Sequence, residues 1–237
     1  MTNKLESANT GRTAAIIVAA GSSRRMKGVD KLLAPLGARP LVAHSVEAFA
    51  CHPAIDELVV VASESNQEGL RKIVDSTAGV RASVVVGGRR RRDSVLHGLR
   101  ALTAACEYVI VHDAARPLVD SAIIEAALSG AREVGAALCA VPVSDTVKRA
   151  DPSGKVSSTV TREGLWLAQT PQAFRKDLLL RAHDTIGIDV TDDAALIELL
   201  GEPVKLVMGS TRNIKVTLPE DLALARALLA AKEDEQG

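Results

Sequence analysis

The sequence contains very few aromatic residues: one Trp, one Tyr and two Phe among 237 residues, or 2%. Hydrophobic residues nevertheless make up 47% of the chain, so its core must be built from Val, Ile, Leu and Ala. Aliphatic residues of this kind are typical of helices packed on a buried parallel sheet. A chain of this length forms one domain, or one domain with a small appendage.

An excess of either charge is also missing, because Lys and Arg together number 29 and so do Asp and Glu. A neutral chain lacks the basic field of a nucleic-acid-binding protein, so any anion site must be local. No apolar run is long enough to span a membrane, and the polar N-terminus lacks a signal peptide. The three cysteines have no zinc-ligand spacing, which indicates buried or half-buried free thiols in a reducing compartment. We therefore expect a cytoplasmic protein with neither a nucleic-acid nor a membrane partner.

Short β-branched runs alternate with helical patterns over the first part of the chain, and the strands are predicted at 14–19, 57–62, 82–86, 107–112 and 136–143. Such alternation predicts right-handed βαβ units and a Rossmann-like, mostly parallel sheet flanked by helices. Asp120 and Ser121 are expected to cap the helix that follows them. We expect one domain over 13–233, with disordered tails at 1–12 and 233–237.

A different pattern follows at 144–161, where two alternating polar and β-branched arms surround the turn sequence "DPSG". This pattern predicts a protruding β-hairpin. Because an isolated hairpin is only marginally stable, we expect this arm to lie on another subunit. Two helices, the strand "VKLVMG", the extended segment "NIKVT" and a closing helix come after it.

The first predicted strand leads directly into "AAGSSRRMKGVDK", a loop of small residues with four cations. In open α/β sheets, ligands bind beyond the carboxyl ends of the strands. Glycine and alanine let backbone N–H groups approach an anion, and arginine and lysine add charge-assisted bonds to phosphate. The loop matches neither GxGxxG nor GxxxxGK[ST]. Taken alone, it could equally be a tight turn with a solvated basic face.

Two further polar loops, "GGRRRRDSV" at 87–95 and "VHDAARP" at 111–117, follow the third and fourth predicted strands. The carboxyl ends of parallel strands lie at one edge of the sheet, so the three loops are expected to converge there. Asp113 could bind ribose hydroxyls or magnesium, or it could simply be a turn residue. The convergence favours a site for a nucleoside triphosphate.

These residues carry a resemblance. "VAAGSSRRM" followed by "DK" is similar to the signature of nucleotidyltransferases with a glycosyltransferase-A-like fold. The ordered set "VHDAARP", "DTVKR", "REGLWLAQTPQAF", "TDDA" and "NIKVT" resembles the 2-C-methyl-D-erythritol 4-phosphate cytidylyltransferase family over nearly the whole chain. The resemblance implies that CTP and methylerythritol phosphate react to give the CDP-alcohol and pyrophosphate, in the non-mevalonate isoprenoid pathway.

The resemblance also implies roles for individual residues at the nucleotide. Those that would stabilise the triphosphate and the transition state are Arg25, Lys31 and Lys215. Those that would bind the nucleotide are Ala19, Ala20, Gly21, Ser23, Gly88, Ser94 and Asp113, with Gly88 and Ser94 facing the cytosine.

For the second substrate, the implied residues are Asp113, Arg116, Thr146, Arg162 and Lys215. Arg162 would act in the neighbouring subunit's site of a homodimer formed through the 144–161 arm. The implied cofactor is Mg²⁺, held mainly by the CTP phosphates with Asp113 as a possible ligand. The five histidines are interpreted as structural or surface residues.

The chain departs from the family pattern at Val18, Ser23, Asp30 and Arg89, where proline, glycine, proline and an acidic residue are common. Val18, Ser23 and "GVDK" also resemble molybdopterin nucleotidyltransferases. The alternatives are therefore a ribitol- or other polyol-phosphate cytidylyltransferase, a molybdopterin nucleotidyltransferase, and a nucleotide-binding module without enzyme activity.

Overall fold

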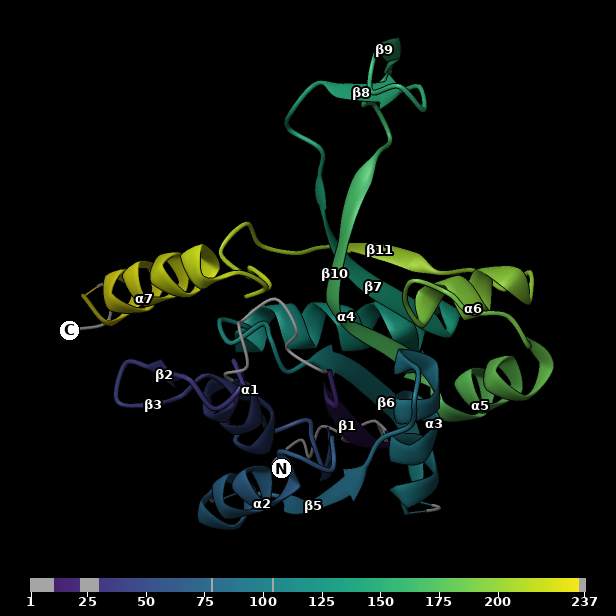
Figure 1. Cartoon of the computed structure of the whole chain (residues 1–237). Helices are drawn as coiled ribbons and strands as arrows, with labels where there is room; N and C mark the ends of the chain where they lie inside the picture. Colours follow the sequence, from purple (N-terminus) through teal and green to yellow (C-terminus); the bar gives the residue numbers. More distant parts are fainter. Residues whose placement is uncertain (1–10, 22–29, 78, 104, 235–237) are drawn as a thin grey trace, which may run out of the picture.

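The computed structural model describes residues 11–21, 30–77, 79–103 and 105–234, and its centre is a mixed sheet of seven strands. The strand order across the sheet is β11-β7-β10-β6-β1-β4-β5 (Figure 1). The strands are β1 (Arg12–Ala19), β4 (Glu57–Ala62), β5 (Arg81–Val86), β6 (Cys106–Asp113), β7 (Ala136–Pro142), β10 (Trp166–Arg175) and β11 (Lys205–Met208). The parallel strands expected from the sequence are present, and the predicted fold class is confirmed.

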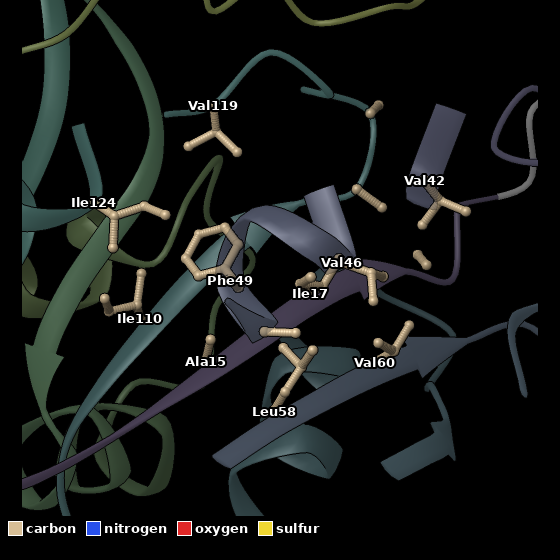
Figure 2. Packing of buried hydrophobic residues seen from close by; sticks show 14 of the residues in the cluster. Ala15, Ile17, Val42, Val46, Phe49, Leu58, Val60, Ile110, Val119 and Ile124 are labelled. Carbon is tan, nitrogen blue, oxygen red and sulfur yellow. The ribbon is translucent and has the colours of Figure 1, made fainter. Parts of the chain in front are cut away.

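Helices cover both faces of this sheet. Successive residues of a strand point to opposite faces, so each strand contributes apolar side chains to two separate hydrophobic clusters. In β1, Ala15 and Ile17 belong to one hydrophobic cluster, and Ala14 and Ile16 belong to the other. Figure 2 shows Phe49 of α1 packed over Ala15 and Ile110, within the first of these clusters. The helices are α1 (Leu41–Ala50), α2 (Gln67–Ser76), α3 (Arg91–Ala101), α4 (Ser121–Val134), α5 (Lys176–Thr185), α6 (Ala194–Leu199) and α7 (Pro219–Asp234).

Local signals define the ends of α4 clearly. The Asp120 side chain accepts a hydrogen bond from the Ile123 backbone N–H at 2.9 Å, which confirms the predicted N-cap. At the other end, Gly135 adopts a φ of 97°, a left-handed conformation that favours glycine. The helix therefore ends where β7 begins.

One strand of the central sheet was not predicted from the sequence. β10 runs antiparallel to both of its neighbours, β6 and β7. Its first three residues are exposed, the next six are buried, and its pairing with β7 shifts register between Ala168 and Gln172. Because of this irregular burial, the segment shows neither alternation nor a continuous apolar run. A further pair of two-residue strands, β2 (Pro35–Leu36) and β3 (Arg39–Pro40), was also not predicted.

The 144–161 segment contains an antiparallel pair, β8 (Val147–Ala150) and β9 (Val156–Val160). Figure 1 shows this pair projecting beyond the end of the sheet, on extensions from β7 and β10. Most of its residues are exposed. Its role in dimerisation stays a prediction.

The cysteines and the chain ends complete the comparison with the sequence. Cys51, Cys106 and Cys139 form no disulfide; Cys51 is exposed, which corrects the expectation that all three are at least half-buried. Arg12 already belongs to β1 and α7 runs to Asp234, so the rest of the expected tails, 1–10 and 235–237, lies outside the described residues. Among the described helices, none has the length and apolar character needed to cross a membrane.

Candidate active site

A cleft of about 530 Å³ lies at the carboxyl edge of the sheet, where the predicted loops converge. The loop after β1, the loop after β5 and the end of β6 all contribute to it, and the 213–217 segment closes one side. The predicted residues that line it are Ala20, Gly21, Lys31, Gly88, Ser94, Asp113 and Lys215. Ala19 lies just behind them, buried at the end of β1.

Asp113 is the carboxylate of this cleft and is held by two cations. Its Oδ2 lies 2.7 Å from Lys215 Nζ, and its Oδ1 lies 3.5 Å from Arg91 Nη2. Burial opposes ionisation of this carboxyl group, but the attraction of Arg91 and Lys215 is stronger and holds the pKa of Asp113 well below its usual range. Asp113 is therefore an anion with a fixed orientation at neutral pH.

Arg91 and Asp193 were not assigned a role from the sequence, although both stand in motifs noted there. Arg91 Nη1 lies 2.6 Å from Asp193 Oδ2, and the Asp193 side chain is only 1% exposed. Burial disfavours the charged guanidinium, but attraction to Asp193 and Asp113 raises the pKa of Arg91. Arg91 thus connects the buried start of α6 to the carboxylate in the cleft.

Lys31 and Lys215 are both held in the cleft by the short segment around Val216. Lys31 Nζ donates a hydrogen bond to the Val216 carbonyl at 2.8 Å, and Lys215 is the preceding residue. The Val216 N–H in turn donates to the Ala115 carbonyl at 2.8 Å, which ties the segment to the loop after β6. Lys31 and Lys215 are therefore held near each other although they are far apart in the sequence.

Gly87 brings the loop after β5 close to the residue that follows β1, and Gly88 brings it close to the start of α3. A Cβ at Gly87 would lie 2.7 Å from the Ala20 Cβ and from Ser94 Oγ, and one at Gly88 would lie 2.3 Å from the Asp93 Cβ. No larger residue fits at either position without a shift of its neighbours. The Gly88 N–H donates to Ser94 Oγ at 3.1 Å, so this loop and α3 form one rigid wall.

A buried network fixes the backbone at Asp113 from behind. The Asp113 N–H donates to Thr170 Oγ1 at 3.0 Å, and this hydroxyl lies 3.2 Å from His112 Nδ1. The other ring nitrogen of His112 lies 3.1 Å from the Arg116 carbonyl. Burial lowers the pKa of His112 to about 4, so the ring is neutral and structural. Thr170 is a second residue that sequence reasoning missed; the quoted motif "AQTPQAF" contains it, but its spacing alone gives no role.

Three residues predicted to bind the second substrate do not line the cleft. Arg116 lies behind it and donates through Nη1 to the Asn213 carbonyl at 2.7 Å. Thr146 and Arg162 lie at the base of the arm and are exposed, and Arg162 donates to the Ser144 carbonyl. Ser23 and Arg25 lie outside the described residues.

A metal ion would find few protein ligands in the described part of the chain, where no group of three or more His, Cys, Asp or Glu side chains could hold one. Asp113 is the only carboxylate among the described residues that line the cleft. Mg²⁺ commonly binds through one or two carboxylates together with substrate phosphates and water. The residues present therefore fit a magnesium ion that is held mainly by a bound triphosphate.

Comparisons with known proteins agree on one family. The family model described as IspD, 2-C-methyl-D-erythritol 4-phosphate cytidylyltransferase, matches residues 13–231. A protein of that name from Dehalococcoides mccartyi is 44% identical over 219 residues, which are 92% of this chain and 96% of the relative. One from Alkaliphilus oremlandii is 40% identical over 232 residues, 95% of this chain and 98% of the relative.

Solved structures give the same result. The crystal structure of 4-diphosphocytidyl-2C-methyl-D-erythritol synthase from Anaerococcus prevotii superposes with a TM-score of 0.82 at 31% identity, over 93% of this chain and 99% of that one. The 2-C-methyl-D-erythritol 4-phosphate cytidylyltransferase from Thermus thermophilus superposes with a TM-score of 0.76 at 33% identity, over 92% and 98%.

Proposed function

This chain belongs to the 2-C-methyl-D-erythritol 4-phosphate cytidylyltransferase family, and we propose that its cleft transfers the cytidylyl group of CTP to 2-C-methyl-D-erythritol 4-phosphate. A phosphate oxygen of the polyol phosphate attacks the α-phosphorus of CTP, and the bond from that phosphorus to the β-phosphate oxygen breaks. The products are 4-diphosphocytidyl-2-C-methyl-D-erythritol and pyrophosphate, within the non-mevalonate isoprenoid pathway.

The observation that carries this proposal is that Asp113, its partners Lys215 and Arg91, and Lys31 all line one cleft at the carboxyl edge of the sheet. Phosphoryl transfer depends on positioning and on charge neutralisation more than on a base. The attacking phosphate is already an anion and needs no histidine to activate it. Lys31 and Lys215 would neutralise the charge that develops on the triphosphate in the transition state.

The wall formed by Gly88 and Ser94 would accept the cytosine. Gly87 packs directly against Ala20, so Ala20, Gly88 and Ser94 form adjacent parts of the cleft lining against which a small, flat base could lie. Backbone and hydroxyl groups of this wall can then make hydrogen bonds to the edge of the pyrimidine. A purine would leave those donors and acceptors unpaired, which is how polar pockets reject a wrong substrate.

Magnesium is the cofactor we propose, with Asp113 as the protein ligand beside the CTP phosphates. When bound, it would neutralise the triphosphate and orient it for in-line attack. Asp113, held by Lys215 and Arg91, keeps its orientation for the ribose or the metal.

The second substrate would be bound by two subunits. Lys215 lines the cleft of its own chain and Arg116 lies behind it, whereas Arg162 lies between β9 and β10, at the base of the projecting arm. Val156 of the arm and Leu167 at its base are 65% and 56% exposed, large apolar side chains that a partner would cover. We propose a homodimer in which each arm brings Arg162 to the polyol phosphate of the other subunit.

Nucleotide selectivity tests this function. Purified protein supplied with methylerythritol phosphate and magnesium should use CTP on the order of 10²-fold better than GTP or ATP, measured as pyrophosphate release. Equal turnover of GTP and CTP would contradict the assignment and would favour a molybdopterin nucleotidyltransferase.

A further inference from the structure

Asn66, between β4 and α2, connects two segments that lie on either side of the first loop of the cleft. Its Nδ2 donates one hydrogen bond to the Ala19 carbonyl at 3.1 Å and another to Asp30 Oδ2 at 2.9 Å. Ala19 is the last residue of β1, and Asp30 directly precedes Lys31. One amide nitrogen therefore holds the end of β1 and the start of the Lys31 turn together.

The orientation of this amide is set by its own turn. Asn66 Oδ1 accepts a hydrogen bond from the Ser63 N–H at 2.9 Å, and the Asn66 N–H donates to Ser63 Oγ at 3.3 Å. Since a backbone N–H can pair only with the amide oxygen, the nitrogen must face Ala19 and Asp30. The residue is 2% exposed, so water does not compete for these bonds.

Asp30 connects Asn66 to the turn that contains Lys31. Its Oδ1 accepts a hydrogen bond from the Leu32 N–H at 3.0 Å, and its carbonyl accepts one from the Leu33 N–H at 3.1 Å. Lys31 thus lies within a turn whose first side chain is tied to β1 through Asn66. The position of this turn decides where the lysine stem enters the cleft.

We propose that Asn66 and Asp30 are positioning residues that set the place of Lys31 relative to the end of β1. The inference rests on the proposed role of Lys31 at the triphosphate. A displacement of about 1 Å in a catalytic group can cost as much as 10²-fold in rate, so a pair of hydrogen bonds at this point has leverage on catalysis. Neither residue touches substrate in this account, because they act through Lys31.

The test uses Asn66→Asp, which keeps the oxygen that pairs with Ser63 but removes both donated bonds and places a carboxylate against Asp30. We expect kcat to fall by roughly 10-fold or more, with a smaller change in the KM for methylerythritol phosphate. The matched control is Gln67→Glu, the same amide-to-acid change one residue along, where no described hydrogen bond reaches Ala19 or Asp30. It should leave kcat within about 2-fold of wild type.

Two further variants separate positioning from loss of structure. Asn66→Asp combined with Asp30→Asn restores the bond between residues 66 and 30 with donor and acceptor exchanged, but leaves the Ala19 carbonyl without its donor, so it should recover part of the lost kcat. In a Lys31→Ala background, Asn66→Asp should cause no further loss, because residues that act through one group are not additive. If Asn66→Asp does not fold, Asp30→Ala replaces it as the test variant. Its position is half-buried, and we expect the same fall in kcat.

The inference fails if Asn66→Asp, folded, has the kinetics of Gln67→Glu, or if its effect is equally large without Lys31. It also fails if the exchanged pair is folded but recovers nothing. If Lys31→Ala itself retains wild-type kcat, the proposed role of Lys31 in the reaction is wrong instead, so the two failures can be told apart.

Discussion

At the scale of single residues, the cleft depends on a few charges that sequence and structure both place at one edge. Asp113 stays ionised because Lys215 and Arg91 compensate for its burial. Lys31 and Lys215 approach from one side, held by the carbonyl of Val216 and the backbone around it. In the proposed reaction, removing either lysine would take a preorganised positive charge away from the transition state.

We expect Lys31→Ala and Lys215→Ala each to lower kcat by roughly 10²-fold or more, measured by pyrophosphate release at saturating substrates. Lys205→Ala is the control, because that lysine lies on β11, pairs with Glu133 of α4 and is outside the cleft lining. The control should keep normal kcat. Near-normal kcat in either cleft variant, or a loss that tracks unfolding by circular dichroism, would contradict the assignment.

A second residue-scale prediction concerns His183 in α5. It is 5% exposed, and neither ring nitrogen has a hydrogen-bond partner among the described residues. Burial, with the nearby charge of Arg92, lowers the pKa of His183 to about 4. The unfolded chain protonates this histidine at its ordinary pKa of about 6.5, so it binds more protons than the folded chain between these two values.

The free energy of unfolding should therefore fall as the pH drops from about 6.5 towards 4, with His183 contributing up to about 1.4 kcal/mol per pH unit. In urea titrations at several pH values, His183→Leu should show a shallower fall than wild type. An unaltered slope in the His183 variant would contradict this account of the buried ring.

At the scale of elements, α3 is fastened to the last turn of α5 and to the connection between α5 and α6. Arg90 pairs with Asp189 at 3.2 Å, Arg91 pairs with Asp193, and Arg92 donates to the carbonyl of His183 at 3.1 Å. From the sequence, the run of four arginines reads as a polar loop suited to an anion. The structure shows that Arg90, Arg91 and Arg92 bind neighbouring segments of the same chain, and composition alone does not identify these partners.

Asp193 and Asp189 both pair with arginines of this run, but Asp193 is buried and Asp189 is exposed. Asp193→Asn should lower kcat/KM for CTP about 10-fold, because a hydrogen bond to a charged group contributes about 1.5–3 kcal/mol and Arg91 loses its buried partner. Asp189→Asn removes only an exposed pair and should change kcat/KM little. Equal effects of the two substitutions would show that Arg91 does not transmit the change to Asp113.

The parallel strands and their loops could be predicted because continuous β-branched runs and small or charged loop residues are local signals. β10 could not, because its burial changes along its length and its partners β6 and β7 are remote in the sequence. The same reason explains the site: Lys31 and Asp113 stand in recognisable motifs, whereas Thr170, Asn66 and Asp193 act through tertiary contacts. Asp30, seen in the sequence only as a departure from proline, gains a structural role from Asn66.

At the scale of the whole molecule, the proposed homodimer combines the arm of one subunit with the cleft of the other. Figure 1 shows β8 and β9 held away from the sheet, and Arg162 at the base of this arm is exposed. An arginine can donate two parallel hydrogen bonds to a phosphate dianion, a bidentate geometry that lysine does not provide. A reciprocal exchange about a two-fold axis would give each cleft one arginine from its partner.

Mixing Arg162→Ala chains with Lys31→Ala chains tests this exchange. Each variant alone should have little activity at limiting polyol phosphate, whereas the mixed dimer has both lesions in one site and none in the other. After equal mixing and random subunit exchange, activity should return to about a quarter of wild type, since half of the dimers are mixed and each has one intact site. Demonstrated subunit exchange without any recovery would show that Arg162 serves its own subunit.

The measurement that tests the central claim most directly is identification of the product by mass spectrometry. The purified protein is supplied with CTP, magnesium and, in separate reactions, 2-C-methyl-D-erythritol 4-phosphate, ribitol 5-phosphate or another polyol phosphate. We predict 4-diphosphocytidyl-2-C-methyl-D-erythritol and pyrophosphate in equal amounts, with the other polyol phosphates used far less. Preferential formation of a CDP-ribitol, or no product from methylerythritol phosphate with folded protein, would contradict the account.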